Sequence, residues 1–194
     1  EFRRVLFRSN LKADFDQGVT IEFWFKKTSF DTTKTVKEVI FDMWNNGTMA
    51  AATYGRLTIE VDGEAGSASP FKVTAQSGST PVGIFEQTLG STPRIASLAT
   101  WNHYSVVLQN SGSSFVTKLY VNGYLDDTKT TASTTLGEIT NNTVHGRIGG
   151  LLTGTVAPPT HTPAGRLSAS AGSGKLSASM DEFRYWKTAR NGEE

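Results

Sequence analysis

The stretch VTIEFWFK, residues 19–26, decides the fold because apolar and polar side chains alternate strictly along it. One face is apolar and the other is mixed: Val19, Ile21, Phe23 and Phe25 against Thr20, Glu22, Trp24 and Lys26. A period of two, with β-branched and aromatic residues, is typical of a strand that lays one face on a hydrophobic core. The stretch therefore predicts a half-buried β-strand whose non-core face carries Trp24.

Similar patterns recur along the chain and predict further strands. We expect them at residues 36–44, 56–62, 70–76, 101–109, 115–121, 124–130, 144–151 and 180–187. Asn122-Gly123 between two patterned arms is the strongest short-range hairpin signal, because both turn residues need a positive φ. No segment shows a helical period of 3.6, so many short strands with frequent turns indicate an all-β sandwich or barrel. The expected core includes Ile21, Phe23, Phe25, Leu57, Ile59, Leu119 and Val121.

Two stretches, residues 77–93 and 153–174, are rich in Gly, Ser, Thr and Pro and are expected to be surface loops. Loops on a rigid sandwich commonly carry recognition. We therefore expect these two stretches to set the specificity for any ligand.

The first nine residues, EFRRVLFRS, equal the translation of the end of a common short-read sequencing adapter. We interpret residues 1–9 as an artefactual scar that contributes no family-specific structure. Without its three Arg and one Glu, 16 basic and 17 acidic residues remain, so no charge argument for nucleic acid is left. The chain has no Cys, which excludes disulfides and thiolate metal sites, and no apolar run suggests membrane insertion.

Five segments, taken in order, resemble the concanavalin A-like lectin/glucanase superfamily in its laminin G-like branch. They are VTIEFWFK (19–26), WNHYSVVL (101–108), KLYVNGYLDD (118–127), GRIGG (146–150) and GKLSASMDEFRYWKTARNGEE (174–194). The resemblance implies one two-sheet antiparallel jelly-roll sandwich over residues 10–194, truncated at its N-terminus and at its C-terminus. It also implies structural roles for the motif residues Asp181, Glu182, Trp101, Asn122 and Gly123. The chain is similar, too, to domains in structural proteins of marine bacteriophages.

The predicted non-core face of the first strand offers a candidate binding surface. Trp24 lies between Glu22 and Lys26 there, and an aromatic ring with polar neighbours could stack a sugar ring. The competing interpretation, which the sequence alone favours, is that Trp24 packs under a loop crossing the sheet.

Asp126 and Asp127, with Asn122, lie at the predicted hairpin and are the candidate metal ligands. Calcium prefers clustered carboxylate and carbonyl oxygens, and the laminin G-like resemblance implies calcium at such a rim. No run in the sequence has dense calcium-ligand spacing.

Glu60-Val61-Asp62-Gly63-Glu64 resembles the Glu-x-Asp-x-Glu pattern of the glucanase branch. A retaining glycosidase needs two carboxyl groups held about 5–5.5 Å apart. Gly63 favours a turn over a central strand, so the competing interpretation is a solvated strand end. We expect no catalytic residues in this chain.

The sequence thus predicts a non-catalytic recognition module for a glycan or a cell-surface protein, within a larger extracellular or virion protein. The first alternative is a phage virion assembly domain with no small ligand. The second is a glycoside hydrolase that uses Glu60 and Glu64. Neither a nucleic-acid partner nor membrane insertion is expected.

Overall fold

The computed structural model describes residues 11–29, 38–45, 47, 52–61, 69, 71–78, 82–91, 98–140, 144–152 and 175–192. These residues form ten strands in two antiparallel five-stranded sheets, without an α-helix in the described ranges. The predicted all-β fold is therefore confirmed. The predicted scar at residues 1–9 and the stretch 153–174 lie outside the described residues.

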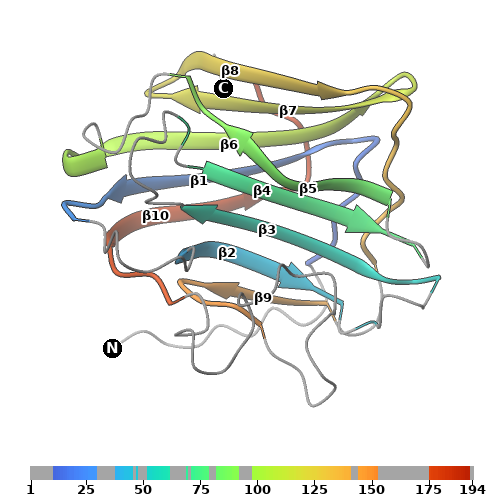
Figure 1. Ribbon diagram of the computed structural model, residues 1–194, viewed down its shortest axis with the longest axis horizontal. Coiled ribbons are helices and arrows are strands. Elements are labelled where there is room, and N and C mark those ends of the chain that lie inside the picture. Colours follow the sequence, from blue (N-terminus) through green and yellow to red (C-terminus); the bar gives the residue numbers. More distant parts are fainter. Residues whose placement is uncertain are drawn as a thin grey trace.

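The first sheet has the strand order β10-β1-β6-β7-β8 (Figure 1). Its strands are β1 (Val19–Lys26), β6 (Asn102–Ser111), β7 (Ser114–Val121), β8 (Tyr124–Thr131) and β10 (Ser179–Trp186). The strand β1, predicted from strict alternation, has the expected bounds. It lies second from the edge, paired with β10 on one side and β6 on the other.

The second sheet has the order β5-β4-β3-β2-β9. Its strands are β2 (Glu38–Trp44), β3 (Gly55–Val61), β4 (Phe71–Ser77), β5 (Val82–Leu89) and β9 (His145–Ile148). Figure 1 looks through both sheets, with β8 at one side of the molecule and β9 at the opposite side.

The prediction of a loop over residues 77–93 is wrong for about half of this stretch, because β5 occupies residues 82–89. The strand lies at the edge of the second sheet, and only Ile84 and Leu89 are buried along it. Positive φ angles at Gly83 (141°) and Glu86 (49°), and a register shift at which β5 has one more residue than β4, interrupt its pairing. These irregularities remove the period-two signal by which a strand is found.

Aromatic side chains from both sheets fill the core between them. Phe23 of β1 and Tyr104 of β6 contact Phe71 of β4, with ring centroids 6.5 and 5.1 Å apart. Burial raises the pKa of the Tyr104 hydroxyl to about 12. Of the seven predicted core residues, all but Val121 are fully buried, and Val121 packs half-buried against the same cluster.

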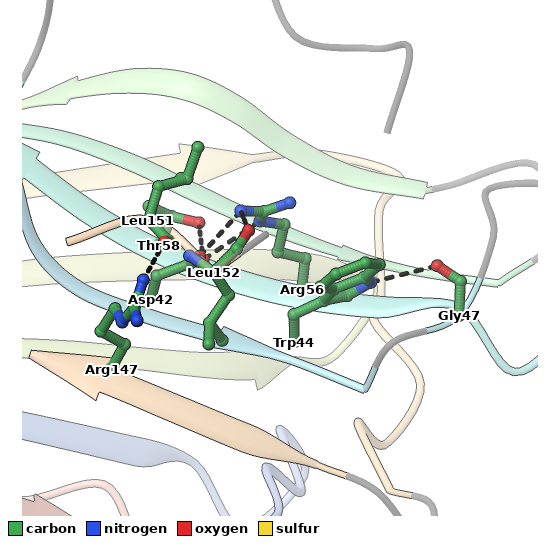
Figure 2. Close-up of polar contacts among 8 residues, drawn as sticks. All are labelled: Asp42, Trp44, Gly47, Arg56, Thr58, Arg147, Leu151 and Leu152. Carbon is green, nitrogen blue, oxygen red and sulfur yellow. Dashed lines mark hydrogen bonds and ion pairs between the residues drawn. The ribbon is translucent and has the colours of Figure 1, made fainter. Parts of the chain in front are cut away.

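A buried ion pair organises the polar face of the second sheet (Figure 2). Asp42 of β2 receives two hydrogen bonds from Arg56 of β3, from Nε at 3.0 Å and from Nη2 at 2.7 Å. It also accepts from Thr58 Oγ1 and from the backbone amide of Leu152, each at 2.7 Å. Both charged side chains are almost completely buried, so each depends on the other for compensation.

We expect Asp42→Ala to lower the free energy of unfolding by about 3–5 kcal/mol, because it leaves the Arg56 guanidinium buried without its counter-charge. Urea unfolding followed by Trp fluorescence measures the change. Glu138→Ala is the control, since its ion pair with Lys12 is largely exposed and should contribute about 1 kcal/mol or less. A similar small effect for both variants would contradict the role given to Asp42.

Candidate functional site

An open recess of about 500 Å³ lies on the outer side of the first sheet. It is lined by Trp24 of β1, Trp101 just before β6, and Asp181 and Glu182 of β10. The recess brings together two aromatic rings and two carboxylates from segments that are far apart in the sequence.

Trp24 faces outward because its neighbours Phe23 and Phe25 are committed to the core. On the sheet, Trp24 lies opposite His103 on one side and opposite Asp181 on the other. The rings of Trp24 and His103 lie 5.5 Å apart. Trp24 is 37% exposed and Trp101 is 45% exposed. Both indoles therefore present part of their surface to solvent.

A β-bulge in β10 explains how two adjacent carboxylates line one recess. Glu22 pairs with Arg184 and Trp24 with Asp181, so β10 contains one more residue than β1 over this interval. Glu182 has a φ of 46°, in the left-handed region that a Glu rarely adopts. In a regular strand, neighbouring side chains point to opposite faces. The bulge lets Asp181 and Glu182 share a face.

The contacts of these two carboxylates are local to β10 within the described part of the chain. Asp181 Oδ1 accepts the backbone N–H of Glu182 at 2.8 Å. Glu182 Oε2 accepts from Arg184 Nη2 at 2.9 Å, and both of those side chains are about half exposed. The family resemblance implies structural roles for Asp181 and Glu182, and these contacts of both side chains stay within β10.

Glu22 and Lys26, predicted as flanking ligand contacts, do not line the recess. Glu22 is buried and accepts hydrogen bonds from Trp186 Nε1 at 3.0 Å and Arg190 Nη1 at 3.3 Å. The Arg190 guanidinium also lies 4.3 Å from the centroid of the Trp186 ring. Glu22 is thus engaged in holding the segment after β10 against β1. Lys26 is half-buried opposite Ser179.

The predicted hairpin turn is present between β7 and β8. Asn122 and Gly123 both have positive φ angles, 51° and 84°. Asn122 Oδ1 accepts the backbone N–H of His103 at 2.9 Å, and its Nδ2 donates to Asn102 Oδ1 at 2.9 Å. The turn is therefore fastened to the start of β6, close to the residue that packs on Trp24.

Asp126 and Asp127 fasten the end of β5 to β8. Asp127 Oδ2 accepts the Gly90 amide at 2.9 Å and pairs with Lys129 at 3.1 Å. Asp126 Oδ2 accepts the Ser91 amide at 2.7 Å, and Ser91 Oγ donates to its Oδ1. A backbone amide therefore donates to one oxygen of each carboxylate, and the single Ser91 Oγ proton is shared between Asp126 Oδ1 and the Asp126 carbonyl oxygen. No group of three or more acidic or His side chains able to hold a metal occurs among the described residues.

We expect Asp127→Ala to lower the free energy of unfolding by about 1–2 kcal/mol, because the Gly90 amide loses its acceptor. Thermal unfolding in the presence of a chelator measures this change. Calcium at these residues stays a prediction of the family resemblance. A melting temperature that rises with calcium in the parent, and not in Asp127→Ala, would establish it.

Glu60 is the described member of the glucanase-like pattern, while Asp62 and Glu64 lie outside the described residues. It lies near the end of β3 and is 2% exposed, so its interpretation as part of a solvated strand end is wrong. Its side chain lies on the polar face of the second sheet, between Val39 and Lys72 of the adjacent strands. A general acid or nucleophile must reach its substrate, and a Glu60 this buried does not present its carboxyl group to solvent.

Two five-stranded antiparallel sheets, packed face to face around one aromatic core, define a jelly-roll β-sandwich. A laminin G-like family model, described as the concanavalin A-like lectin/glucanases superfamily, matches residues 5–194. The chain therefore belongs to this superfamily. No helix in the described ranges has the length and apolar character needed to cross a membrane.

Among solved structures, the chain is similar to the native heptameric SAP-like pentraxin from Limulus polyphemus. The TM-score is 0.48 at 13% sequence identity, over 94% of this chain and 70% of that chain. No curated protein matches the sequence.

Proposed function

We propose that the domain is a non-catalytic carbohydrate-binding module of a larger extracellular or virion protein, with the sugar held in the recess between Trp24 and Trp101. The observation that carries this proposal is the pair of partly exposed indoles on a recess that also contains carboxylates. A pyranose ring has an apolar face of C–H groups and a rim of hydroxyl groups. Indole rings suit the face, and ionised carboxylates accept hydrogen bonds from the rim.

The setting of Trp24 supports binding without large rearrangement. Its strand is paired on both sides, and the ring packs on His103. Binding groups on strands are held more rigidly than groups on loops, and a ring already in place loses little conformational entropy on binding. The recess is open, so we expect weak affinity for a single short glycan.

Two observations support a binding role over hydrolysis. The recess carboxylates are consecutive residues on one strand, whereas glycosidases place their two carboxyl groups on either side of the scissile bond. Glu60, the described member of the Glu60 and Glu64 pair, is buried on the other sheet. Release of reducing sugar from β-glucans, carrageenans or agars that is lost in Glu60→Gln would instead establish the hydrolase alternative.

We expect Trp24→Ala and Trp101→Ala each to weaken glycan binding about tenfold, since one aromatic contact contributes about 1 kcal/mol or slightly more. A glycan array of the parent protein identifies a ligand, and calorimetry then measures the loss for each variant. Tyr124→Ala is the matched control, because Tyr124 is an aromatic residue that is 81% exposed outside the recess. Binding that survives the double variant Trp24→Ala, Trp101→Ala would remove the recess as the site.

A second candidate function, assembly within a virion or docking to a cell-surface protein, is favoured by the edge strand β8. Tyr124 and Leu125 are exposed there, and edge strands can pair with a further chain. If β8 pairs with a second copy of the chain during assembly, the protein self-associates in sedimentation velocity and Leu125→Lys abolishes the association. A monomer at all concentrations would contradict self-assembly through this edge.

A further inference from the structure

We infer, on the basis of the proposed function, that the recess prefers sugars with a free ammonium group over N-acetylated and anionic sugars. Amino sugars of the glucosamine type are the ligand class. The inference depends on which charges in the recess are compensated and on how indole faces interact with cations.

The charged side chains of the described recess lining are both carboxylates, and Lys26, on the same face of β1 as Trp24, does not line the recess. Asp181 has one hydrogen bond, to the N–H of the next residue, and no ion pair within the described part of the chain. Glu182 is the only lining residue with a cationic partner there, because Arg184 pairs with it. The lining therefore holds two carboxylates against one neighbouring guanidinium, and the uncompensated charge belongs to Asp181.

The indoles add a second attraction of the same sign. The face of a Trp ring carries negative electrostatic potential and attracts an ammonium group placed over it, more strongly than the other aromatic side chains do. A ligand that stacks between Trp24 and Trp101 would bring its substituents close to both rings and to Asp181. A free ammonium is attracted both by the rings and by the Asp181 carboxylate. An acetamide is uncharged and lacks both attractions, and a uronate or sulfate is repelled by the carboxylate.

The bulge that places both carboxylates at the recess has a backbone conformation of raised free energy at Glu182. A non-glycine residue with positive φ costs free energy, and such residues cluster at functional sites. At Glu182 the strain has a chemical result, which is that a second carboxylate joins Asp181 at the recess. The Asp42–Arg56 ion pair, by contrast, is buried and presents neither charge to a ligand.

The test compares three oligosaccharides of equal length with the full chain by calorimetry: a glucosamine tetramer, its fully N-acetylated form, and a galacturonate tetramer. We expect the glucosamine tetramer to bind about fivefold more tightly than the acetylated form at low salt, the size of one exposed ion pair or cation–π contact. The preference should shrink as salt screens the charges. The galacturonate tetramer should bind least.

Two variants with opposite effects make the test specific. Asp181→Asn should remove most of the preference by weakening glucosamine binding about fivefold, while acetylated binding changes less than about twofold. Arg184→Ala frees Glu182 from its partner and should strengthen glucosamine binding. Glu138→Gln removes one negative charge outside the recess lining, and it should leave the affinity for both oligosaccharides unchanged.

The outcomes separate this inference from the proposed function. Equal binding of the glucosamine and acetylated tetramers, lost in Trp24→Ala, would overturn the ammonium preference and leave carbohydrate binding in place. If Glu138→Gln reduces the preference as much as Asp181→Asn does, the preference arises from the overall charge of the protein. That result also overturns the inference. No binding of any sugar would remove both.

Discussion

The structure depends on the burial of one face of β1 against the opposite sheet. Phe23 and Phe25 lie in the core, where their rings contact Tyr104 and each other. Because side chains alternate along a strand, fixing these two residues inward fixes Trp24 outward between them. Slippage of β1 by one residue would exchange the two faces and expose the aromatic core. The register that stabilises the sandwich is therefore the same register that presents the candidate binding residue.

A second constraint comes from two carboxylates on β2, which hold segments far away in the sequence. Asp42 accepts the amide of Leu152, and Glu38 accepts the amide of Ser177 at 2.6 Å. Each carboxylate also has a buried cationic partner, Arg56 for Asp42 and Lys27 for Glu38. Charge-assisted hydrogen bonds of this kind are strong where water is excluded. One strand thereby fixes the chain that follows β9 and the chain that precedes β10, which aligns β10 with β1 beside the recess.

The sequence predicts those parts of the fold that have a local signal. Strict alternation located β1, and Asn122-Gly123 located the β7–β8 hairpin, because each pattern is complete within a few residues. Edge strand β5 was missed because its bulged pairing leaves only Ile84 and Leu89 buried. The site was predicted in part: Trp24 followed from alternation on one strand. The other lining residues could not be predicted in this way. Trp101 and Asp181 come close to Trp24 through the order of strands in the sheet, and Glu182 faces the recess because of a bulge.

The shallow form of the recess has consequences for how such a domain would bind. A recess of about 500 Å³ that is open to solvent contacts a short stretch of a glycan and buries little of it. The free energy from two aromatic contacts and a few hydrogen bonds is largely offset by the loss of translational and rotational freedom. Strong attachment to a polymer therefore requires several recesses that act together, at a spacing that matches the repeat of the glycan. Affinity in the larger protein would then be set by the number and arrangement of such domains, whereas the side chains of the recess would set which sugar is chosen.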